Sequence, residues 1–180
     1  IGSMLLEYRL ENVLGVGGFG ITYLAHDTLL EKDVAIKEYF PSTSVSRGSD
    51  KSVALTGPDM AEEYETGLDR FLKEARTLAG FSHPNIVRVR EFGLEDAQPW
   101  IAMECLEGRT LGAELHEGPV PVERTRRLLS AVCAALGALH ERGLVHRDLK
   151  PGNVFLVKDG RVTAVDHPDA LPGITRDTVV

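Results

Sequence analysis

One stretch of the chain combines residue types that could transfer a phosphoryl group. It is the polar loop His146-Arg147-Asp148-Leu149-Lys150-Pro151-Gly152-Asn153. Asp148 could orient or deprotonate a hydroxyl nucleophile, and Lys150 could offset charge on the transferred group. Asn153 could bind a divalent metal through its amide oxygen. A chance polar loop is the alternative, and the specific order of these residue types argues against it.

A second candidate is a glycine cluster between two short apolar runs, Gly15-Val16-Gly17-Gly18-Phe19-Gly20. Glycine lets the backbone approach a ligand closely, and backbone N–H groups in such a loop can bond phosphate oxygens. A dinucleotide-binding fingerprint should open a helix, whereas residues 21–25 continue as a strand. The pattern therefore favours a hairpin that covers a phosphate group, with a plain glycine-rich turn as the alternative.

A lysine and a glutamate complete the candidate set. Lys37 closes an apolar run that begins at Val34, where an unpaired buried ammonium would be costly. The functional interpretation is a lysine that reaches nucleotide phosphates and pairs with a helix carboxylate. Glu74 is the candidate partner because it lies on the side of a predicted helix that carries apolar residues. A surface lysine at a strand end and a solvated glutamate are the alternatives.

Hydrophobic patterning indicates the elements that must position these residues. Apolar spacing predicts a helix over 59–78, a longer helix over 122–142, and a small hairpin from 154–157 and 162–165. Residues 41–58 are rich in Ser, Gly, Thr and Asp, so we expect a loop there. Five β-rich runs are expected to be strands: 8–13, 21–25, 33–37, 86–92 and 100–103.

Composition is that of an ordinary globular protein and excludes some classes of function. The 180 residues carry a formal net charge of -7, which argues against a nucleic-acid partner bound through positive charge. No run approaches the roughly 18 apolar residues of a membrane span, and no signal peptide is visible. Cys105 and Cys133 lie in apolar stretches, so we expect buried free thiols and a cytoplasmic location. Residues 1–3, before Met4, are interpreted as a cloning scar.

The three motifs together resemble those of the eukaryotic-type protein kinase family, in that family's order. The resemblance covers about residues 8–166. Lys150, within Asp-Leu-Lys-Pro, is similar to the serine/threonine branch, and the runs 18–25 and 36–41 resemble bacterial members. The resemblance implies transfer of the ATP γ-phosphoryl group to a Ser or Thr hydroxyl of a protein substrate, with ATP and Mg²⁺ as cofactors.

The resemblance also implies a fold. It is an α+β, protein-kinase-like fold, with a five-stranded antiparallel sheet and helix C in an N-lobe over residues 4–103. A hinge over 104–108 leads to an incomplete helical C-lobe over 109–180. This second part would hold helices αD and αE, the catalytic loop and the start of the activation segment.

Roles for individual residues follow from the resemblance. It makes Asp148 the base, assisted by Lys150, and makes Lys37 and Glu74 the pair that positions the phosphates. Metal ligands would be Asn153 and Asp166. The residues that it places around ATP are Leu14, Gly15, Val16, Gly17, Gly18, Phe19, Gly20, Thr22, Ala35, Lys37, Met103, Glu104, Leu106 and Phe155.

Some of these ATP-site residues have specific expectations. Met103 resembles the gatekeeper, and the adenine ring would lie between Ala35 and Phe155. The backbone of Glu104 and Leu106 would face the adenine edge, and Thr22 stands where the family usually has valine. Core packing without ligand contact is the alternative for Met103 and Phe155.

The sequence departs from the family pattern in three places. His167 and Pro168 follow Asp166 where the family has Phe-Gly, and no Ala-Pro-Glu element follows. The interval from Lys37 to Glu74 is long (74 − 37 = 37 residues), which indicates an insertion, expected to be flexible.

These departures leave more than one function open. An active kinase, a nucleotide-binding pseudokinase and a scaffold without transferase activity are the three hypotheses. The short C-lobe also predicts self-association through the apolar stripe of the helix over 122–142.

Overall fold

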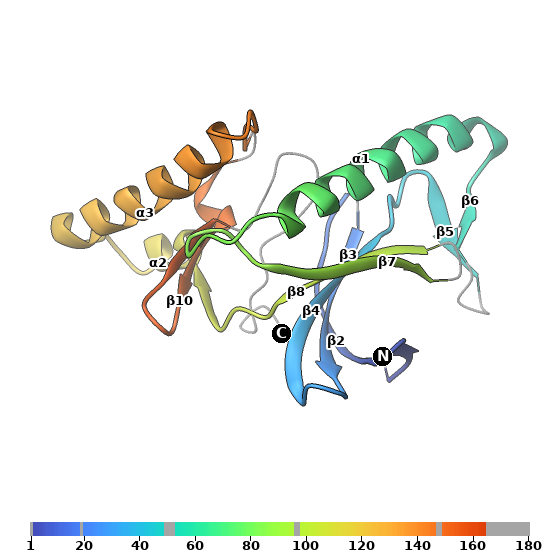
Figure 1. Cartoon of the computed structure of the whole chain (residues 1–180), viewed down its shortest axis with the longest axis horizontal. Helices are drawn as coiled ribbons and strands as arrows, with labels where there is room; N and C mark the ends of the chain where they lie inside the picture. The colour runs from blue at the N-terminus through green and yellow to red at the C-terminus, as the bar shows by residue number, and fades with distance from the viewer. Residues whose placement is uncertain (1, 19, 49–52, 96–97, 147–148, 165–180) are drawn as a thin grey trace.

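The structure is a computed structural model, and most of the chain is described in it. The described residues are 2–18, 20–48, 53–95, 98–146 and 149–164 (Figure 1). A sheet of six antiparallel strands dominates the first part, in the order β1-β2-β3-β4-β8-β7. Its strands are β1 (Met4–Leu5), β2 (Tyr8–Val16), β3 (Gly20–Asp27), β4 (Lys32–Tyr39), β7 (Val89–Glu95) and β8 (Gln98–Glu104).

The five predicted strands are all present, and the sheet has one strand more than expected. Strand β1 is only two residues long and pairs with the start of β2, with Leu5 opposite Tyr8. A two-residue strand has no alternating pattern of its own, so the sequence could not indicate it.

The two faces of the sheet are both apolar, because side chains alternate along each strand. One face carries a buried cluster that includes Ile36 and Trp100. The opposite face carries Ala35, Tyr39 and Met103, which belong to the cluster packed beneath helix α1. Residues next to each other on β4 therefore lie in different layers.

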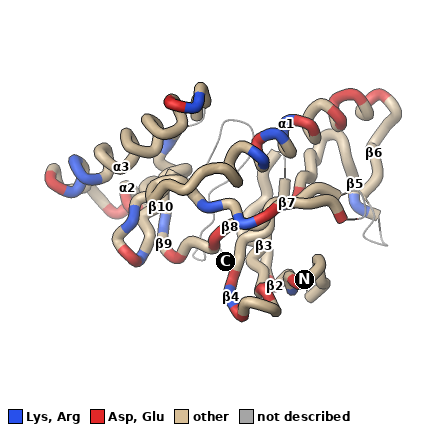
Figure 2. Tube along the Cα trace, in the orientation of Figure 1, with Lys and Arg blue, Asp and Glu red and all other residues tan. Residues whose placement is uncertain are grey.

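Helix α1 (Ala61–Ala79) lies across this second face and confirms the helix predicted over 59–78. A 3-10 turn, η1 (Pro58–Met60), precedes it. Phe71, Ala75 and Leu78 are buried against the sheet. Acidic residues open the helix and a basic residue closes it (Figure 2), as the helix dipole favours.

The insertion between β4 and α1 is not the loop that we expected. It contains a hairpin of two three-residue strands, β5 (Val45–Arg47) and β6 (Val53–Leu55). The side chain of Val45 is buried, and the N–H of Thr56 donates to the carbonyl of Ser44 at 3.0 Å. Polar composition concealed these strands because they are too short to show a period.

The second part of the chain holds a three-stranded sheet and two helices. Strands β10 (Val154–Val157) and β11 (Val162–Ala164) form the predicted hairpin, and β9 (Gly108–Thr110) pairs with β10. Helix α2 (Leu111–His116) begins at Thr110, whose hydroxyl accepts from Ala113 N–H at 3.0 Å. A 3-10 turn, η2 (Pro151–Asn153), precedes β10. Helix α3 (Val122–His140) confirms the long predicted helix.

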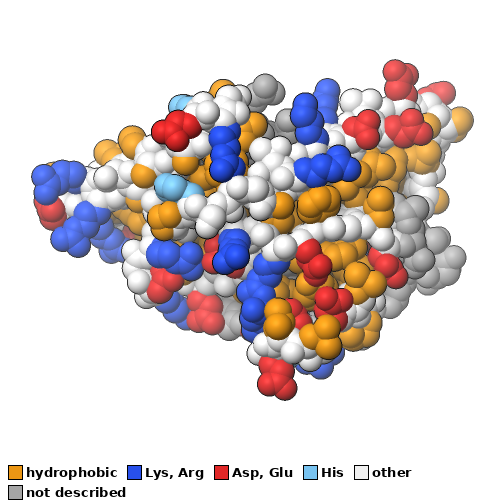
Figure 3. All heavy atoms as spheres, viewed as in Figure 1, with side chains coloured by type: hydrophobic (Ala, Val, Ile, Leu, Met, Phe, Trp, Pro, Cys, Tyr) orange, Lys and Arg blue, Asp and Glu red, His pale blue; other side chains and the backbone are white. Residues whose placement is uncertain are grey.

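The apolar stripe of α3 finds partners within the chain. Ala135 and Leu139 pack with Phe81, Ile86 and Ala164, which lie after α1 and on β11. The sequence predicts that this stripe needs a partner outside the described fold. Because Ala135 and Leu139 are already packed, less of the apolar surface of α3 is exposed for self-association than predicted. Charged side chains cover the first turns of α3, at the left of Figure 3. Self-association through this helix stays a prediction.

Two smaller expectations are settled by the fold. Cys105 and Cys133 are free, as predicted, but Cys133 is exposed and Cys105 is only partly buried. The prediction of two buried thiols was therefore wrong, since Cys133 lies on the outer side of α3. Among the helices of the described residues, none is long and apolar enough to cross a membrane.

Candidate functional site

The glycine cluster forms the turn between β2 and β3, which is the hairpin context that the sequence predicted. Gly15 lies opposite Thr22 in the ladder, and the N–H of Gly17 donates to the carbonyl of Gly20 at 2.9 Å. Val16 is exposed at the tip. This segment therefore forms a hairpin turn and not the start of a helix.

Gly20 is the glycine of this turn that the structure requires for steric reasons. A Cβ atom there would stand 2.3 Å from the backbone oxygen of Glu38 and 3.3 Å from Cε of Lys37. By contrast, a Cβ on Gly15 or Gly18 would meet no atom within 4 Å. Close approach to β4 explains Gly20, and the open space beside the other two leaves room for a ligand.

Lys37 occupies the centre of the sheet. It lies on β4 between Thr22 of β3 and Ile101 of β8, and its side chain is 0% exposed. It shares a face of β4 with Ala35 and Tyr39, so its side chain enters the layer beneath α1. The alternative of a surface lysine at a strand end is excluded by this burial.

Glu74 enters the same layer from the helix. It lies on α1 among Phe71, Ala75 and Leu78 and is 7% exposed. A carboxylate is rarely so buried without a charged or polar partner. The solvated alternative for Glu74 is therefore excluded, and the two charged residues of the predicted pair share one buried layer.

The residues expected around adenine gather in one cluster. All five are buried and pack in the cluster beneath α1. They are Leu14 of β2, Ala35 of β4, Met103 at the end of β8, Leu106 after β8, and Phe155 of β10. Ala35 lies directly opposite Met103 in the ladder. These five residues come from four separate parts of the chain, and the fold brings them together in one apolar cluster.

The connection after β8 carries the hydrogen-bonding groups that were expected to face the adenine edge. The N–H of Glu104 donates to the carbonyl of Arg88 at 2.9 Å, so its own carbonyl is the group that could serve a ligand. The Glu104 carboxylate accepts from Arg88 N–H at 3.0 Å and from the Arg161 guanidinium at 3.4 Å. The Glu104 side chain therefore links the end of β8 to Arg161 in the β10–β11 turn.

The catalytic-loop candidates lie just before β10. Lys150 is exposed at the start of η2, and the N–H of Asn153 donates to the Lys150 carbonyl at 2.9 Å. The Asn153 side chain is buried, two residues before Phe155 of the apolar cluster. Three predicted site residues, Phe19, Asp148 and Asp166, lie outside the described residues.

One structural link near the site was not predicted from the sequence. Asn85, in the turn after α1, donates from its amide to the carbonyl of Val162 at 2.6 Å. The N–H of Ala164 donates to the carbonyl of Asn85 at 2.9 Å. The sequence signal that could have indicated this contact is the side-chain amide of Asn85.

The described residues fit a nucleotide. The Thr22 hydroxyl is 1% exposed and has no hydrogen-bond partner within the described part of the chain, although it lies beside Gly15 and Lys37. A buried hydroxyl of this kind is costly unless a bound group satisfies it. Together with the apolar cluster and the buried ammonium of Lys37, it matches a ligand that is apolar at one end and anionic at the other.

A divalent metal is only partly accounted for. Asn153 offers an amide oxygen, a hard ligand that suits Mg²⁺. Within the described residues, no group of three or more His, Cys, Asp and Glu side chains is placed to hold a metal ion. Mg²⁺ commonly uses one or two protein ligands and completes its shell with phosphates and water, so the donor set is compatible with it.

Comparison with known proteins decides the family. The model of the protein kinase domain matches residues 8–168. The chain belongs to the protein kinase family. In this kinase domain the sheet with α1 forms the N-lobe, and the predicted α+β kinase fold is confirmed.

The curated relatives of this kinase domain are bacterial serine/threonine-protein kinases. PksC of Streptomyces coelicolor is 37% identical over 169 residues, which is 89% of this chain and 27% of that protein. The pkn2 kinase of Myxococcus xanthus is 33% identical over 99% of this chain and 21% of its own length. PknB of Mycobacterium leprae is 32% identical, over 89% and 24%. The chain thus spans about a quarter of these relatives.

Solved structures agree with this kinase fold. The apo form of PpkA-294 superposes with a TM-score of 0.87 at 32% identity, covering 93% of this chain and 60% of that one. The PknI kinase domain of Mycobacterium tuberculosis gives a TM-score of 0.72 at 27% identity, covering 94% and 61%.

Proposed function

We propose that this chain forms the ATP-binding and phosphoryl-transfer part of a bacterial serine/threonine protein kinase. The observation that carries the proposal is the complete burial of Lys37, in the same layer as Glu74 and against the glycine turn at Gly20. A buried ammonium beside a hairpin with open space at Gly15 and Gly18 suits a ligand with phosphate groups.

The adenine ring would bind among the residues of the apolar cluster. In this proposal Ala35 and Phe155 contact its two faces, and Met103 limits how far the ring enters the cluster. The Glu104 carbonyl and the backbone of Leu106 would meet the polar edge of the ring. Burial of apolar surface on both faces of the ring would supply much of the affinity.

Phosphoryl transfer would depend on the loop before β10. We assign Asp148 to orient and accept the proton of the substrate hydroxyl, and Lys150 to offset charge on the transferred group. Asn153, with Asp166, would bind the metal. When bound, Mg²⁺ neutralises charge on the phosphates of ATP. Lys37, held by Glu74, would orient the phosphates and so fix the donor group against the acceptor hydroxyl.

Acceptor and location belong to the same proposal. The acceptor would be a Ser or Thr hydroxyl of a protein, since Lys150 stands in the pattern shared with the serine/threonine branch. A cytoplasmic location is compatible with the two free cysteines, because disulfides rarely form in a reducing compartment.

Transfer of radiolabel from [γ-³²P]ATP to casein, in the presence of Mg²⁺, tests the proposed function. We expect label on Ser or Thr of casein with the wild-type chain and none with Asp148→Asn. Lys32→Met is the matched control, because Lys32 is exposed at the far end of β4 and should leave transfer unchanged. Equal labelling by wild type and Asp148→Asn would contradict the assigned base.

A further inference from the structure

The insertion between β4 and α1 forms a hydrogen-bonded ion pair with the end of β4, the strand that carries Lys37. Arg47 of β5 donates from Nη2 to both carboxylate oxygens of Glu38, each at 2.6 Å. Glu38 is the residue after Lys37. Its carboxylate also accepts from the Tyr23 hydroxyl of β3 at 2.9 Å. The hairpin is thus attached to β4 by a charged contact. The sequence predicts a flexible loop here and does not predict this contact.

The surroundings of this contact strengthen it. The Glu38 side chain is 12% exposed and that of Arg47 is 33% exposed. The Arg47 guanidinium also lies 5.0 Å from the centre of the Phe40 ring. A hydrogen-bonded ion pair that is partly removed from water contributes more than an exposed one. Glu38 therefore has two donors that fix it from different strands, Tyr23 and Arg47.

The opposite face of the same strand end is held by the helix. Tyr39 packs against Tyr64 and Phe71 of α1, with ring centres 5.3 and 5.4 Å apart. A Cβ atom on Gly67 would stand 2.0 Å from the Tyr39 hydroxyl, so α1 approaches this ring as closely as glycine allows. Lys37 is therefore followed by two residues with contacts on opposite faces of the sheet. Glu38 contacts the hairpin, and Tyr39 contacts α1.

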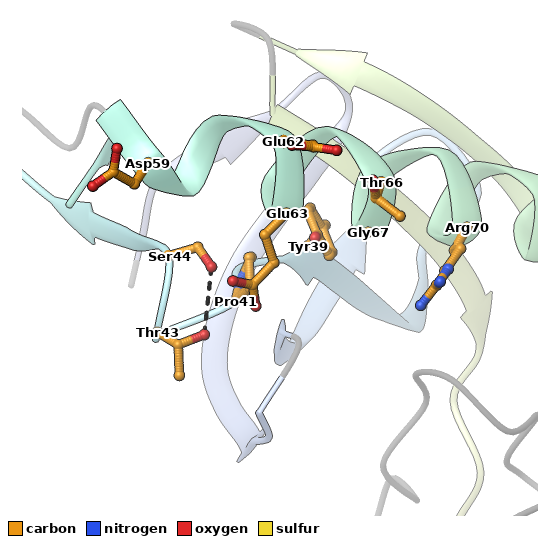
Figure 4. A pocket seen from close by; sticks show the side chains of 10 residues that line it. All are labelled: Tyr39, Pro41, Thr43, Ser44, Asp59, Glu62, Glu63, Thr66, Gly67 and Arg70. Carbon is orange, nitrogen blue, oxygen red and sulfur yellow. Dashed lines mark hydrogen bonds between the residues drawn. The ribbon is translucent and has the colours of Figure 1, made fainter. Parts of the chain in front are cut away.

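The segment that leads from β4 into the hairpin lines a cavity together with the start of α1. A cavity of about 460 Å³ separates the segment around Pro41 and Ser44 from the first turns of α1 (Figure 4). Glu63 and Arg70 line it from the helix side, and Tyr39 lies at its floor beneath Gly67. Arg47 of the hairpin contacts β4 at Glu38, and the neighbouring residue Tyr39 contacts α1.

We infer that Arg47 is a positioning residue, and that the β5–β6 hairpin braces the end of β4 so that Lys37 is held in place for nucleotide phosphates. This inference rests on the proposed function, because it assumes that Lys37 meets phosphates. Glu38 connects the hairpin to the glycine turn. Its side chain accepts hydrogen bonds from Arg47, and its backbone oxygen lies close to Gly20 of the glycine turn.

Binding of ATP and of adenosine by the intact chain tests the brace. Adenosine lacks phosphates, so a loss of phosphate positioning should weaken ATP and spare adenosine. For Arg47→Ala we expect the Kd for ATP to rise about fivefold, equivalent to about 1 kcal/mol, with the Kd for adenosine unchanged. Glu38→Gln keeps the side-chain shape and should do the same, and the double variant should be no worse than either single variant.

The matched control is Arg126→Ala, which removes an arginine from an exposed ion pair with Glu123 on α3. It should change neither Kd. Equal weakening of ATP and adenosine by both Arg47→Ala and Glu38→Gln would overturn the inference, because it would indicate a merely structural role. Unchanged ATP binding in both variants would overturn it as well. Failure of the wild-type chain to bind ATP would overturn the proposed function and this inference with it.

Discussion

A Cβ atom on Gly20 would stand 2.3 Å from the backbone oxygen of Glu38, which places the end of the glycine turn in direct contact with β4. Gly20→Ala must therefore push the β2–β3 turn away from the strand of Lys37. Overpacking of this kind costs about 1–3 kcal/mol. We expect a lower free energy of unfolding in urea and a clear loss of ATP affinity.

The same substitution elsewhere in the turn provides the control. A Cβ on Gly18 meets no atom within 4 Å, so Gly18→Ala should leave the free energy of unfolding within about 0.5 kcal/mol of wild type. Equal destabilisation by the two variants would show that the contact at Gly20 is not what matters.

Thr22→Val should move stability and affinity in opposite directions. An unsatisfied buried hydroxyl costs free energy, and valine has nearly the same shape, so the nucleotide-free chain should gain about 1 kcal/mol of stability. If the hydroxyl bonds the nucleotide, the Kd for ATP should rise about fivefold. Thr22→Ser keeps the hydroxyl and should bind ATP like wild type. Tighter ATP binding by Thr22→Val would refute this assignment.

The two cysteines should differ sharply in reactivity. Burial, with a smaller contribution from Glu107, raises the pKa of the Cys105 thiol to about 11, so almost no thiolate forms there at pH 8. Cys133 is exposed on α3. Iodoacetamide at pH 8 should therefore label Cys133 first, as peptide mass spectrometry would show. Labelling of Cys105 should rise only as the pH approaches its raised pKa, and faster labelling of Cys105 at pH 8 would contradict this.

Arg142, in the turn that follows α3, should stabilise the end of α1. Its guanidinium donates to the carbonyl of Gly80 at 2.9 Å and lies 4.1 Å from the centre of the Phe81 ring. A cation at a helix C-terminus and over an aromatic ring contributes about 1 kcal/mol in total at an exposed position. Arg142→Ala should lower the free energy of unfolding by that amount, whereas Arg126→Ala should not. No difference between these two variants would argue against the contact.

The sequence was informative where a pattern extends over several residues. The apolar, β-rich run of β4 and the helical spacing of α1 predicted the elements that carry Lys37 and Glu74, and the glycine cluster predicted the turn. The pairing of Lys37 with Glu74 was indicated by the functional interpretation of the motifs, because a continuous apolar run does not by itself assign Lys37 to one face of β4. The long strands and helices were therefore predictable from the sequence alone.

The remaining features depend on contacts between distant residues. The hairpin of β5 and β6 has strands of three residues, and its attachment through Arg47 and Glu38 has no sequence signature. The links from Asn85 to β11 and from Glu104 to Arg161 join residues 77 and 57 positions apart. In the sequence, Asn85 and Glu104 are recognisable only as polar residues in a turn or at a strand end. Their partners are determined by the fold.

Isothermal titration of the wild-type chain with ATP and Mg²⁺ tests the central claim most directly. We predict saturable binding at one site per chain. Lys37→Met should lose about tenfold or more in affinity, because hydrogen bonds to charged groups contribute about 1.5–3 kcal/mol, while Lys32→Met should bind like wild type. Absence of binding by the wild-type chain, or equal binding by Lys37→Met, would contradict the account.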